Sequence, residues 1–298
     1  MDVDLRQFRH LVPEPVQPAV RRAYLKVGPA TSRLRMSPSF LVIGGQRCGT
    51  TTIFKTLAAH PQVMRPPVEK GTDYYSLRHS RGLEWYRGHF PLVATSRLRT
   101  GKHGEPVAFE ACTYYLFHPF AVERIAADFP QMKLVVMLRD PVERAYSAYK
   151  HELARGFETE TDFERALELE DERLDGEVER MRDDEDYESF AHRHLAYARR
   201  GQYAEQLERV LHHFPAQQLH VIDSEAFFAN PAGEFALLLE FLGLRPWSPM
   251  RFEQHNARPG APMPQGARRR LQAHYAEHDA RLAALLRRPP RWVTAAAG

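Results

Sequence analysis

The fold of this chain is decided by residues 39–51, which read SFLVIGGQRCGTT. The first part of this stretch is a short apolar run between Pro38 and two glycines, a pattern typical of a strand buried on both faces. A polar, glycine-containing loop follows, and residues 51–59 then have the spacing of a helix. That helix is expected to end at His60, because the residue before a proline disfavours the α region. The stretch therefore predicts a buried strand, a loop and a helix in direct succession.

Similar units recur along the chain. Apolar runs predict further strands at residues 106–110, 133–138 and 218–222, and helical spacing predicts helices at 118–129, 142–153, 203–214, 230–243 and 266–286. Because strands and helices alternate without an internal repeat or a long linker, we expect one α/β domain with a central, mainly parallel sheet. This domain spans residues 39–298. Residues 1–38, which are rich in proline and arginine, are expected to form an arm on its surface.

The loop after the first strand resembles a phosphate-binding loop. Gly44 and Gly49 have the GxxxxG spacing of the Walker A motif, in which backbone N–H groups at a helix N-terminus cradle a phosphate. The lysine that should follow is replaced by Thr50, and a cation stands inside the loop as Arg47. Such a loop is poorly suited to a γ-phosphate with Mg²⁺, but it suits a shorter group such as a 5′-phosphosulfate. The alternative is a glycine-rich turn that binds no ligand.

A second candidate site lies at the end of the predicted strand 133–138. Arg139 follows this strand directly, at the edge of the sheet where open α/β proteins bind ligands. Ser147 is eight residues further on, in the following helix, so an arginine fork and a hydroxyl can hold a second phosphate. The alternative is an ordinary ion pair of Arg139 with Asp140 or Glu143 at the helix start.

Composition narrows the kinds of partner. Two cysteines in 298 residues exclude a disulfide scaffold, and no apolar run approaches the roughly 20 residues of a membrane span. No cluster of cysteine and histidine has the spacing of a metal site, so none is expected. Residues 158–188 have a net charge of −12 while the rest of the chain carries +15. A body this basic indicates an anionic partner: a nucleic acid, an acidic surface or a phosphorylated small molecule.

Two segments resemble the sulfotransferases that use 3′-phosphoadenosine 5′-phosphosulfate (PAPS), especially their heparan-sulfate-type and bacterial branch. The segment FLVIGGQRCGTTTIFKTLAAHPQV resembles that family's 5′-phosphosulfate loop, and VVMLRDPVERAYSAY resembles its 3′-phosphate motif. Two later segments, RGQYAEQLERVLHHFPAQQLHVIDSEAFFANP and FLGL, are similar to the family as well, so that the resemblance covers roughly residues 39–290. It implies a three-layer α/β domain of the P-loop type, PAPS as the donor and no metal.

The resemblance also implies a role for individual residues. Arg139 and Ser147 would bind the 3′-phosphate of PAPS, and Tyr203 and Arg258 would add contacts to the nucleotide. Arg47 would stabilise the negative charge on the bridging oxygen of the leaving phosphate, and its pKa is too high for it to donate a proton readily. The 5′-phosphosulfate would be surrounded by Arg47, Cys48, Gly49, Thr50, Thr51 and Thr52.

The transfer also needs a base that accepts the proton of the acceptor, and here the sequence departs from the family pattern. Heparan-type relatives often carry Lys-Glu-x-His-Phe-Phe with the glutamate as base, and the matching stretch here begins Lys70-Gly71, without that glutamate. Three carboxylates are candidates in its place, in the order Glu110, Asp73 and Glu69.

The acceptor is expected to receive the sulfonate on a hydroxyl group, and a carbohydrate, a lipid and a small metabolite all stay open. The acidic residues 158–188 are expected to form a helical insert or a lid beside the acceptor cleft. Many relatives carry an N-terminal membrane anchor that this sequence does not show, so a cytoplasmic protein is expected. The 35 arginines against six lysines suggest a GC-rich bacterial genome. A P-loop kinase or NTPase is the main alternative, a nucleic acid is not the expected partner, and the oligomeric state stays open.

Overall fold

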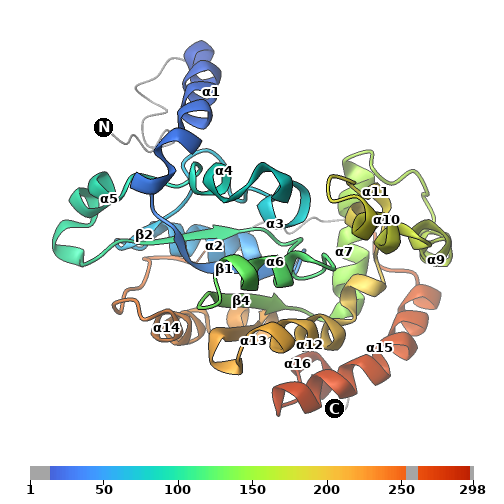
Figure 1. Cartoon of the computed structure of the whole chain (residues 1–298). Coiled ribbons are helices and arrows are strands. Elements are labelled where there is room, and N and C mark those ends of the chain that lie inside the picture. The colour runs from blue at the N-terminus through green and yellow to red at the C-terminus, as the bar shows by residue number, and fades with distance from the viewer. Residues whose placement is uncertain (1–13, 253–260, 296–298) are drawn as a thin grey trace.

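The computed structural model describes residues 14–252 and 261–295, which form a sheet with helices on both of its faces (Figure 1). Five parallel strands lie in the order β2-β3-β1-β4-β5. The predicted α/β class with a central parallel sheet is therefore confirmed. The strands are β1 (Pro38–Gly44), β2 (Val63–Met64), β3 (Val107–Ala111), β4 (Lys133–Leu138) and β5 (Leu219–Asp223).

Helices connect and flank the strands. Those up to β4 are α1 (Gln17–Val27), α2 (Thr50–Ala59), α3 (Tyr74–Leu77), α4 (Leu83–Arg87), α5 (Val93–Thr100) and α6 (Ala121–Asp128). Those between β4 and β5 are α7 (Pro141–Ala154), α8 (Phe163–Glu168), α9 (Glu170–Leu174), α10 (Glu177–Asp183), α11 (Phe190–His194) and α12 (Tyr203–His213). Those after β5 are α13 (Ser224–Ala229), α14 (Pro231–Leu242), α15 (Gln265–Leu286) and α16 (Arg291–Ala295). The short 3₁₀ helices that the argument uses are η2 (Pro29–Leu34), η3 (His79–Arg81) and η5 (Arg199–Gly201).

The two faces of the sheet have separate cores, because successive side chains of a strand point to opposite faces. Leu41 and Val136 face a cluster that also contains side chains of α3, α4, α6 and α12. Val42 and Val135 face a second cluster, completed by α2, α13 and α14. The result is three layers, with the sheet in the middle. A third cluster lies beside the sheet, between α7, α8 and α15.

Local sequence explains where two of the helices begin and end. Asp140 is the N-cap of α7, where its side chain accepts a hydrogen bond from the backbone N–H of Val142 at 2.9 Å, and Pro141 occupies the first turn. Asn230 caps α14 in the same way. Gly243 ends α14 in the left-handed region, at φ 73°, as glycine does most readily.

The four predicted strands are all present, and each lies within one residue of its expected bounds. The edge strand β2 and the helices α3, α4 and α5 were not predicted within residues 62–105. Part of the expected N-terminal arm lies in the described residues: α1 projects from the body and has no buried side chain over Gln17–Val27, while η2 packs against α4 (Figure 1).

The acidic residues 158–188 fold into α8, α9 and α10, and several of their carboxylates are buried. Glu158 accepts hydrogen bonds from two nitrogens of Arg173, at 2.7 and 3.1 Å. Glu170 accepts hydrogen bonds from three consecutive backbone N–H groups, those of residues 197–199, and Glu177 accepts one from the Ser189 hydroxyl. Glu158 thus joins two parts of the insert, whereas Glu170 and Glu177 tie the insert to the segment that follows it, in each case through charge-assisted hydrogen bonds.

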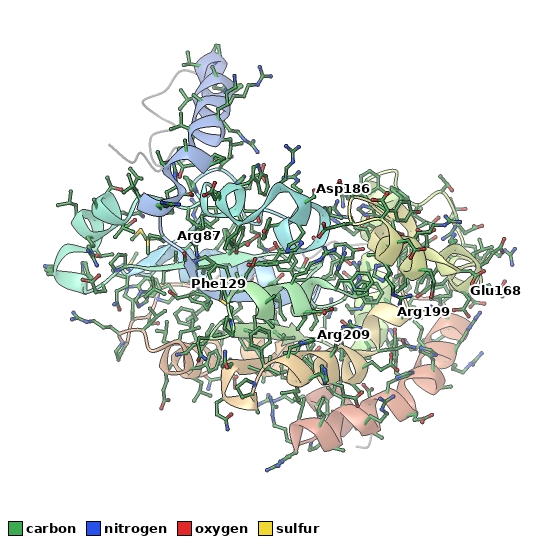
Figure 2. The ribbon with its side chains drawn as sticks, viewed as in Figure 1. Arg87, Phe129, Glu168, Asp186, Arg199 and Arg209 are labelled. Carbon is green, nitrogen blue, oxygen red and sulfur yellow. The ribbon has the colours of Figure 1, made fainter. Side chains whose placement is uncertain are left out.

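The end of the insert docks on the segment that follows α3. The ring nitrogen Nδ1 of His79 lies 2.5 Å from Glu185, and Ser80 donates a hydrogen bond to Asp186. Arg124 of α6 also pairs with Glu185, at 3.4 Å. Figure 2 shows Asp186 at this contact and Glu168 on the outer side of the insert. The insert therefore bridges α7 and the α3 region.

Candidate active site

A cavity of about 890 Å³ opens at the carboxyl edge of the parallel sheet, where the loops after β1, β3, β4 and β5 meet. It contains residues from the loop after β1, the loop that precedes α3, and the helices α7 and α11. The residues that line it include Gln46, Arg47, Cys48, Gly49, Thr50, Thr51, Lys70, Gly71, Asp73, Cys112, Tyr114, Arg139, Ser147, Lys150, His151, Arg155, Arg193, His194, Arg200, Ser224 and Glu225.

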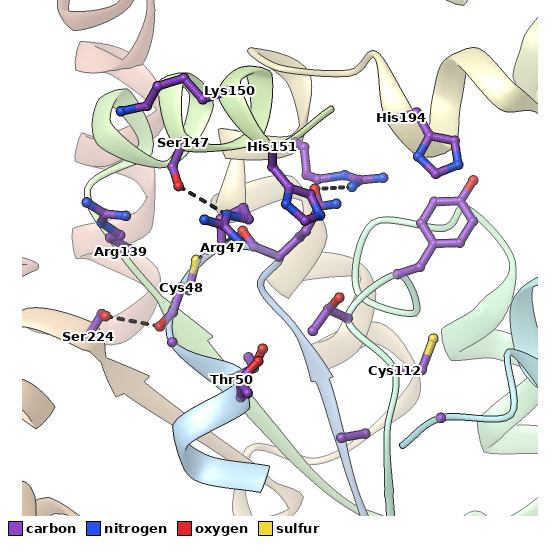
Figure 3. Close-up of a pocket in the computed structure, with 18 of the residues that line it drawn as sticks. Arg47, Cys48, Thr50, Cys112, Arg139, Ser147, Lys150, His151, His194 and Ser224 are labelled. Atoms are coloured by element: carbon purple, nitrogen blue, oxygen red, sulfur yellow. Dashed lines mark hydrogen bonds between the residues drawn. The ribbon is translucent and has the colours of Figure 1, made fainter. Parts of the chain in front are cut away.

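The predicted phosphate loop lies at the floor of this cavity. Gly49 is the N-cap of α2 and has a φ of 93°, which favours glycine; a Cβ atom there would also crowd the Met137 and Phe228 side chains, at 3.1 Å. The loop is also tied to the start of α13, because the Ser224 hydroxyl donates a hydrogen bond to the Cys48 carbonyl oxygen at 3.0 Å (Figure 3). The loop is thus held in one shape beside the start of a helix, which is the geometry of an anion site.

The second predicted site adjoins the first. Arg139 and Ser147 both line the cavity, and the Nε atom of Arg47 donates a hydrogen bond to the Ser147 hydroxyl oxygen at 3.1 Å (Figure 3). Figure 3 also shows Lys150 next to Ser147 on α7. The two parts of the predicted donor site, which are about 100 residues apart in sequence, are therefore in contact.

Two of the predicted donor residues do not line the cavity, and a third lies outside the described residues. Thr52 is 1% exposed and lies below the loop within α2. Tyr203 is also buried, and its hydroxyl donates a hydrogen bond to the Arg139 carbonyl oxygen at 2.9 Å, so it supports the strand end from behind. Arg258 lies outside the described residues.

The structure places Glu110, the first of the three candidate bases, away from the cavity. Its side chain is fully buried in the cluster of tyrosines on one face of the sheet. It accepts hydrogen bonds from the backbone N–H and the hydroxyl of Thr72, at 2.5 and 2.8 Å, and from the hydroxyls of Tyr86 and Tyr115, at 2.7 and 3.0 Å. Burial is the main cause of its raised pKa. Glu110 is thus a structural anchor for the Thr72 turn.

The other two candidates are also separated. Glu69 is directed toward the N-terminal arm, where it pairs with Arg21. Asp73 lines the cavity, and one of its carboxylate oxygens lies 3.1 Å from a guanidinium nitrogen of Arg193. The other oxygen accepts a hydrogen bond from the Cys112 thiol at 3.0 Å. Among the three predicted carboxylates, Asp73 is the one that lines the same cavity as the phosphate loop after β1, which is called the donor loop below.

Gly71, which stands at the glutamate position of the resembling motif, has no space for a side chain. A Cβ atom there would lie 2.6 Å from the Ala111 carbonyl oxygen, a distance that real Cβ atoms do not show. The absence of glutamate at this position is therefore built into the packing of the loop against the end of β3.

A hydrogen-bonded network that the sequence did not reveal joins the donor loop to α11. Arg200 donates hydrogen bonds to the Gln46 side-chain oxygen and to the carbonyl oxygens of His192 and Arg193. The Gln46 amide donates in turn to Glu152, 3.5 Å away, and Glu152 also contacts His194, at 3.1 Å. Contacts across more than 100 residues leave no local pattern in the sequence, so only the fold could reveal them.

The cavity wall is strongly basic. Lys70, Lys150 and Arg155 line it together with the four arginines already described, against three carboxylates. Burial lowers the pKa of Lys70 to about 8. The Lys70 ammonium has no hydrogen-bond or ion-pair partner in residues 14–252 and 261–295, and its nearest described contact is the ring of Phe54, at 5.4 Å. A cavity of this charge suits an anionic ligand.

Cys48 is fully buried in the loop, and burial raises the pKa of its thiol to about 11. Such a thiol stays protonated at neutral pH, which disfavours it as a nucleophile. Among the described residues, no group of three histidine, cysteine, aspartate or glutamate side chains is placed to hold a metal ion, and no helix is long and apolar enough to cross a membrane.

The buried strand, the phosphate loop at a helix start and the cationic end of the neighbouring strand define an α/β domain of the P-loop type. The family model "Sulfotransferase domain" matches residues 37–255, and the chain belongs to this family.

Known proteins that resemble the chain agree with this assignment. A bifunctional heparan sulfate N-deacetylase/N-sulfotransferase of Drosophila melanogaster is 30% identical over 237 residues, which cover 74% of this chain and 21% of that protein. Human heparan sulfate glucosamine 3-O-sulfotransferase 3B1 is 28% identical over 208 residues, covering 70% of this chain and 46% of that protein. The chain thus spans about a fifth to a half of these relatives.

A solved structure is similar to the chain in shape as well as in sequence. The crystal structure of a sulfotransferase from Alicyclobacillus acidocaldarius is 30% identical and superposes with a TM-score of 0.62, covering 85% of this chain and 97% of that one. The architecture described above therefore corresponds to nearly the whole of that structure.

Proposed function

We propose that this protein transfers a sulfonate group from PAPS to a hydroxyl group of a carbohydrate acceptor. The observation that carries the proposal is the meeting of two cationic, phosphate-suited elements in one cavity: the loop with Arg47 and the strand end with Arg139. PAPS carries two anionic groups, and each element suits one of them. The family and the relatives support this reading, since the named relatives are sulfotransferases.

The donor's two ends are assigned to different residues. The loop Arg47–Thr51 at the start of α2 would hold the 5′-phosphosulfate, through its backbone N–H groups and hydroxyls. Arg139 and Ser147 would hold the 3′-phosphate, the arginine as a fork and the hydroxyl as a donor. Thr52 and Tyr203 would act indirectly, because both are buried beneath these groups.

The transfer breaks the bond between the sulfonate sulfur and the bridging phosphate oxygen and forms a bond from the same sulfur to the acceptor oxygen. The other product is adenosine 3′,5′-bisphosphate. Negative charge grows on the bridging oxygen as the first bond breaks, and a fixed cation next to it lowers the barrier. Arg47 is proposed as this cation, and its hydrogen bond to Ser147 supports the assignment, because it links the guanidinium to the residue proposed for the 3′-phosphate.

The acceptor hydroxyl must lose its proton as the new bond forms. Asp73 is proposed as the base, because it is the candidate carboxylate that lines the cavity and because Arg193 and Cys112 fix its orientation. Glu110 is proposed instead as a positioning residue that holds Thr72, the neighbour of Asp73.

A carbohydrate acceptor is proposed because both relatives described above carry heparan sulfate in their names. The acidic residues 158–188 are all described and none of them lines the cavity, so their charge does not face the acceptor directly. We retain the lid as a hypothesis. Its support is the contact of His79 with Glu185 and of Ser80 with Asp186, which joins the insert to the α3 region. A cytoplasmic location and a bacterial source stay predictions.

Isothermal titration calorimetry tests the donor assignment. Adenosine 3′,5′-bisphosphate is expected to bind more tightly than ATP with Mg²⁺, because position 50 lacks the lysine that a γ-phosphate needs. Tighter binding of ATP would favour a P-loop kinase or NTPase and contradict the proposal.

A screen of acceptors with ³⁵S-labelled PAPS tests the transfer itself. Oligosaccharides with and without carboxylate or sulfate groups should be compared with simple phenols and with lipids. Label appearing only in a non-carbohydrate acceptor would contradict the proposed acceptor class and leave the donor assignment standing.

A further inference from the structure

We propose that two buried arginines, Arg144 and Arg200, form a second layer of positive charge behind the donor loop and raise the affinity of the cavity for polyanionic nucleotides. The inference rests on the proposed function, because it concerns the same donor cavity. Arg144 does not line the cavity and would act on the ligand through its charge alone. The same role would explain why both side chains keep nitrogens without a hydrogen-bond partner within the described residues.

Arg144 lies on α7, one helical turn before Ser147. Its side chain is fully buried and is not among the residues that line the cavity. The guanidinium donates a hydrogen bond to the Tyr197 carbonyl oxygen, while its Nε and Nη1 atoms have no hydrogen-bond partner within the described residues. Burying a guanidinium with two nitrogens unsatisfied is costly, so a compensating gain elsewhere is expected.

The charge of Arg144 acts on the donor loop. Burial raises the pKa of the Cys48 thiol to about 11, and the Arg144 guanidinium is the charge that opposes this rise most, ahead of Arg139. Cys48 stands in the middle of the loop that is proposed to hold the phosphosulfate. The positive potential at the loop therefore comes from behind as well as from the cavity wall.

Arg200 occupies the neighbouring position at the back of the cavity. It is 5% exposed, and it lies over the Phe117 ring at 4.7 Å in addition to its hydrogen bonds to Gln46 and to α11. Its Nε atom has no partner within the described residues. Burial, and to a smaller extent the charge of Arg144, lower the pKa of Arg200 to about 10, so the two guanidinium groups repel each other.

Carboxylates do not neutralise this pair fully. In the described part of the chain, neither arginine forms an ion pair. The two carboxylates whose charges act on Arg200 are Glu152 and Glu170, and Glu152 is shared with Arg155, 3.5 Å away, so that three guanidinium groups face two carboxylates. An anion bound in the cavity would relieve the repulsion, and buried charges are screened only weakly by salt.

The test compares a charged with an uncharged replacement of similar length at each site. The variants are Arg144→Lys, Arg144→Met, Arg200→Lys and Arg200→Met, and the ligands are adenosine, adenosine 5′-monophosphate and adenosine 3′,5′-bisphosphate, titrated by calorimetry. Arg199→Met is the matched control, because Arg199 adjoins Arg200 but pairs on the surface with Asp171, at 2.8 Å.

Each Arg→Met variant should weaken the binding of the bisphosphate by on the order of tenfold, weaken the monophosphate less and leave adenosine unchanged, since the effect of a charge scales with the charge of the ligand. The Arg→Lys variants should stay within about threefold of the wild type. The loss should persist when salt is raised from about 0.1 to about 0.5 M.

Equal losses for the three ligands, or equal losses in the Lys and Met variants, would overturn the inference and leave the arginines a purely structural role. Circular dichroism and melting temperatures confirm that each variant is folded, and the Arg144 pair decides alone if Arg200→Met does not fold. The wild type tests the proposed function separately: if it prefers ATP to the bisphosphate, the donor assignment fails, and the Lys and Met comparison is made with the adenosine mono-, di- and triphosphates.

Discussion

The guanidinium of Arg47 and the hydroxyl of Ser147 share a hydrogen bond of 3.1 Å, which joins the loop after β1 to helix α7. Because a hydroxyl that accepts one hydrogen bond keeps its own proton, Ser147 can still donate to a phosphate oxygen. The two anionic ends of one nucleotide would therefore be bound by side chains that contact each other, and a change at either residue should affect both ends.

Replacement of Arg139 by alanine should distinguish the 3′-phosphate site from the rest of the cavity. Arg139→Ala is expected to weaken adenosine 3′,5′-bisphosphate by about 10- to 100-fold, because a charge-assisted hydrogen bond contributes about 1.5–3 kcal/mol. Adenosine 5′-monophosphate, which lacks that phosphate, should lose much less. Calorimetry measures both affinities, and equal losses would contradict the assigned role.

Removal of the proposed base should affect the rate and spare the donor. Asp73→Asn keeps the size of the side chain and removes its basicity, so kcat should fall by roughly 10²- to 10⁴-fold. The affinity for adenosine 3′,5′-bisphosphate should stay within about threefold. Glu69→Gln serves as the comparison, because Glu69 pairs with Arg21 away from the cavity. A fall in kcat for Glu69→Gln without one for Asp73→Asn would reverse the assignment.

Replacement of Glu110 should lower the stability of the fold more than the rate of the reaction. In Glu110→Gln the new amide group would face donors of Thr72, Tyr86 and Tyr115 with a donor of its own, so one or more hydrogen bonds are lost. A loss of about 2 kcal/mol in the free energy of unfolding is expected from an unsatisfied buried group. Denaturation by urea measures it. A stable variant with a rate lowered as strongly as in Asp73→Asn would instead favour Glu110 as the base.

The titration of Lys70 predicts a dependence on pH. Burial lowers its pKa to about 8, so the ammonium is charged at pH 7 and loses its proton as the pH rises through that value. The affinity for PAPS should therefore fall by about tenfold between pH 7 and pH 9 if the ammonium contacts the phosphosulfate. Lys70→Arg should remove this fall, because a guanidinium stays charged. An affinity that rises with pH would contradict the contact.

The sequence was most informative where structure is local. Residues 39–44 form an apolar run between Pro38 and Gly45, residues 134–138 form a second one that ends at Arg139, and both lie in strands close to the expected length. The strand β2 has only two residues, Val63 and Met64, which is too short for any periodic pattern. Its place at the edge of the sheet depends on pairing with β3, a contact that sequence spacing does not encode.

The candidate base could not be chosen from the sequence for a similar reason. Glu110 and Ala111 are neighbours in β3, and successive side chains of a strand point to opposite faces. The register pairs Glu110 with Leu41, which directs it into the tyrosine cluster rather than toward the donor loop. One residue of difference in register would have reversed this, and nothing in the local sequence specifies it.

The contacts of Arg200 show most clearly which parts of the site the sequence alone does not predict. Its hydrogen bond to Gln46 spans 154 residues, and each partner taken alone is an ordinary polar residue in a loop. Such partners come together only when the sheet and α7 are in place. Residue type and spacing therefore revealed the parts of the site that lie on single strand–loop–helix units, and tertiary packing supplied the rest.

The close approach of Gly71 to the Ala111 carbonyl oxygen limits how this enzyme could diverge. A mutation of Gly71 to glutamate would not restore the motif of the relatives by itself, since the backbone of two separate segments would have to move apart first. Any ancestor with glutamate at this position, or any descendant that regains it, must carry a differently shaped end of β3. The choice of base is thus a joint property of two segments, and it is expected to change in evolution only when both change together.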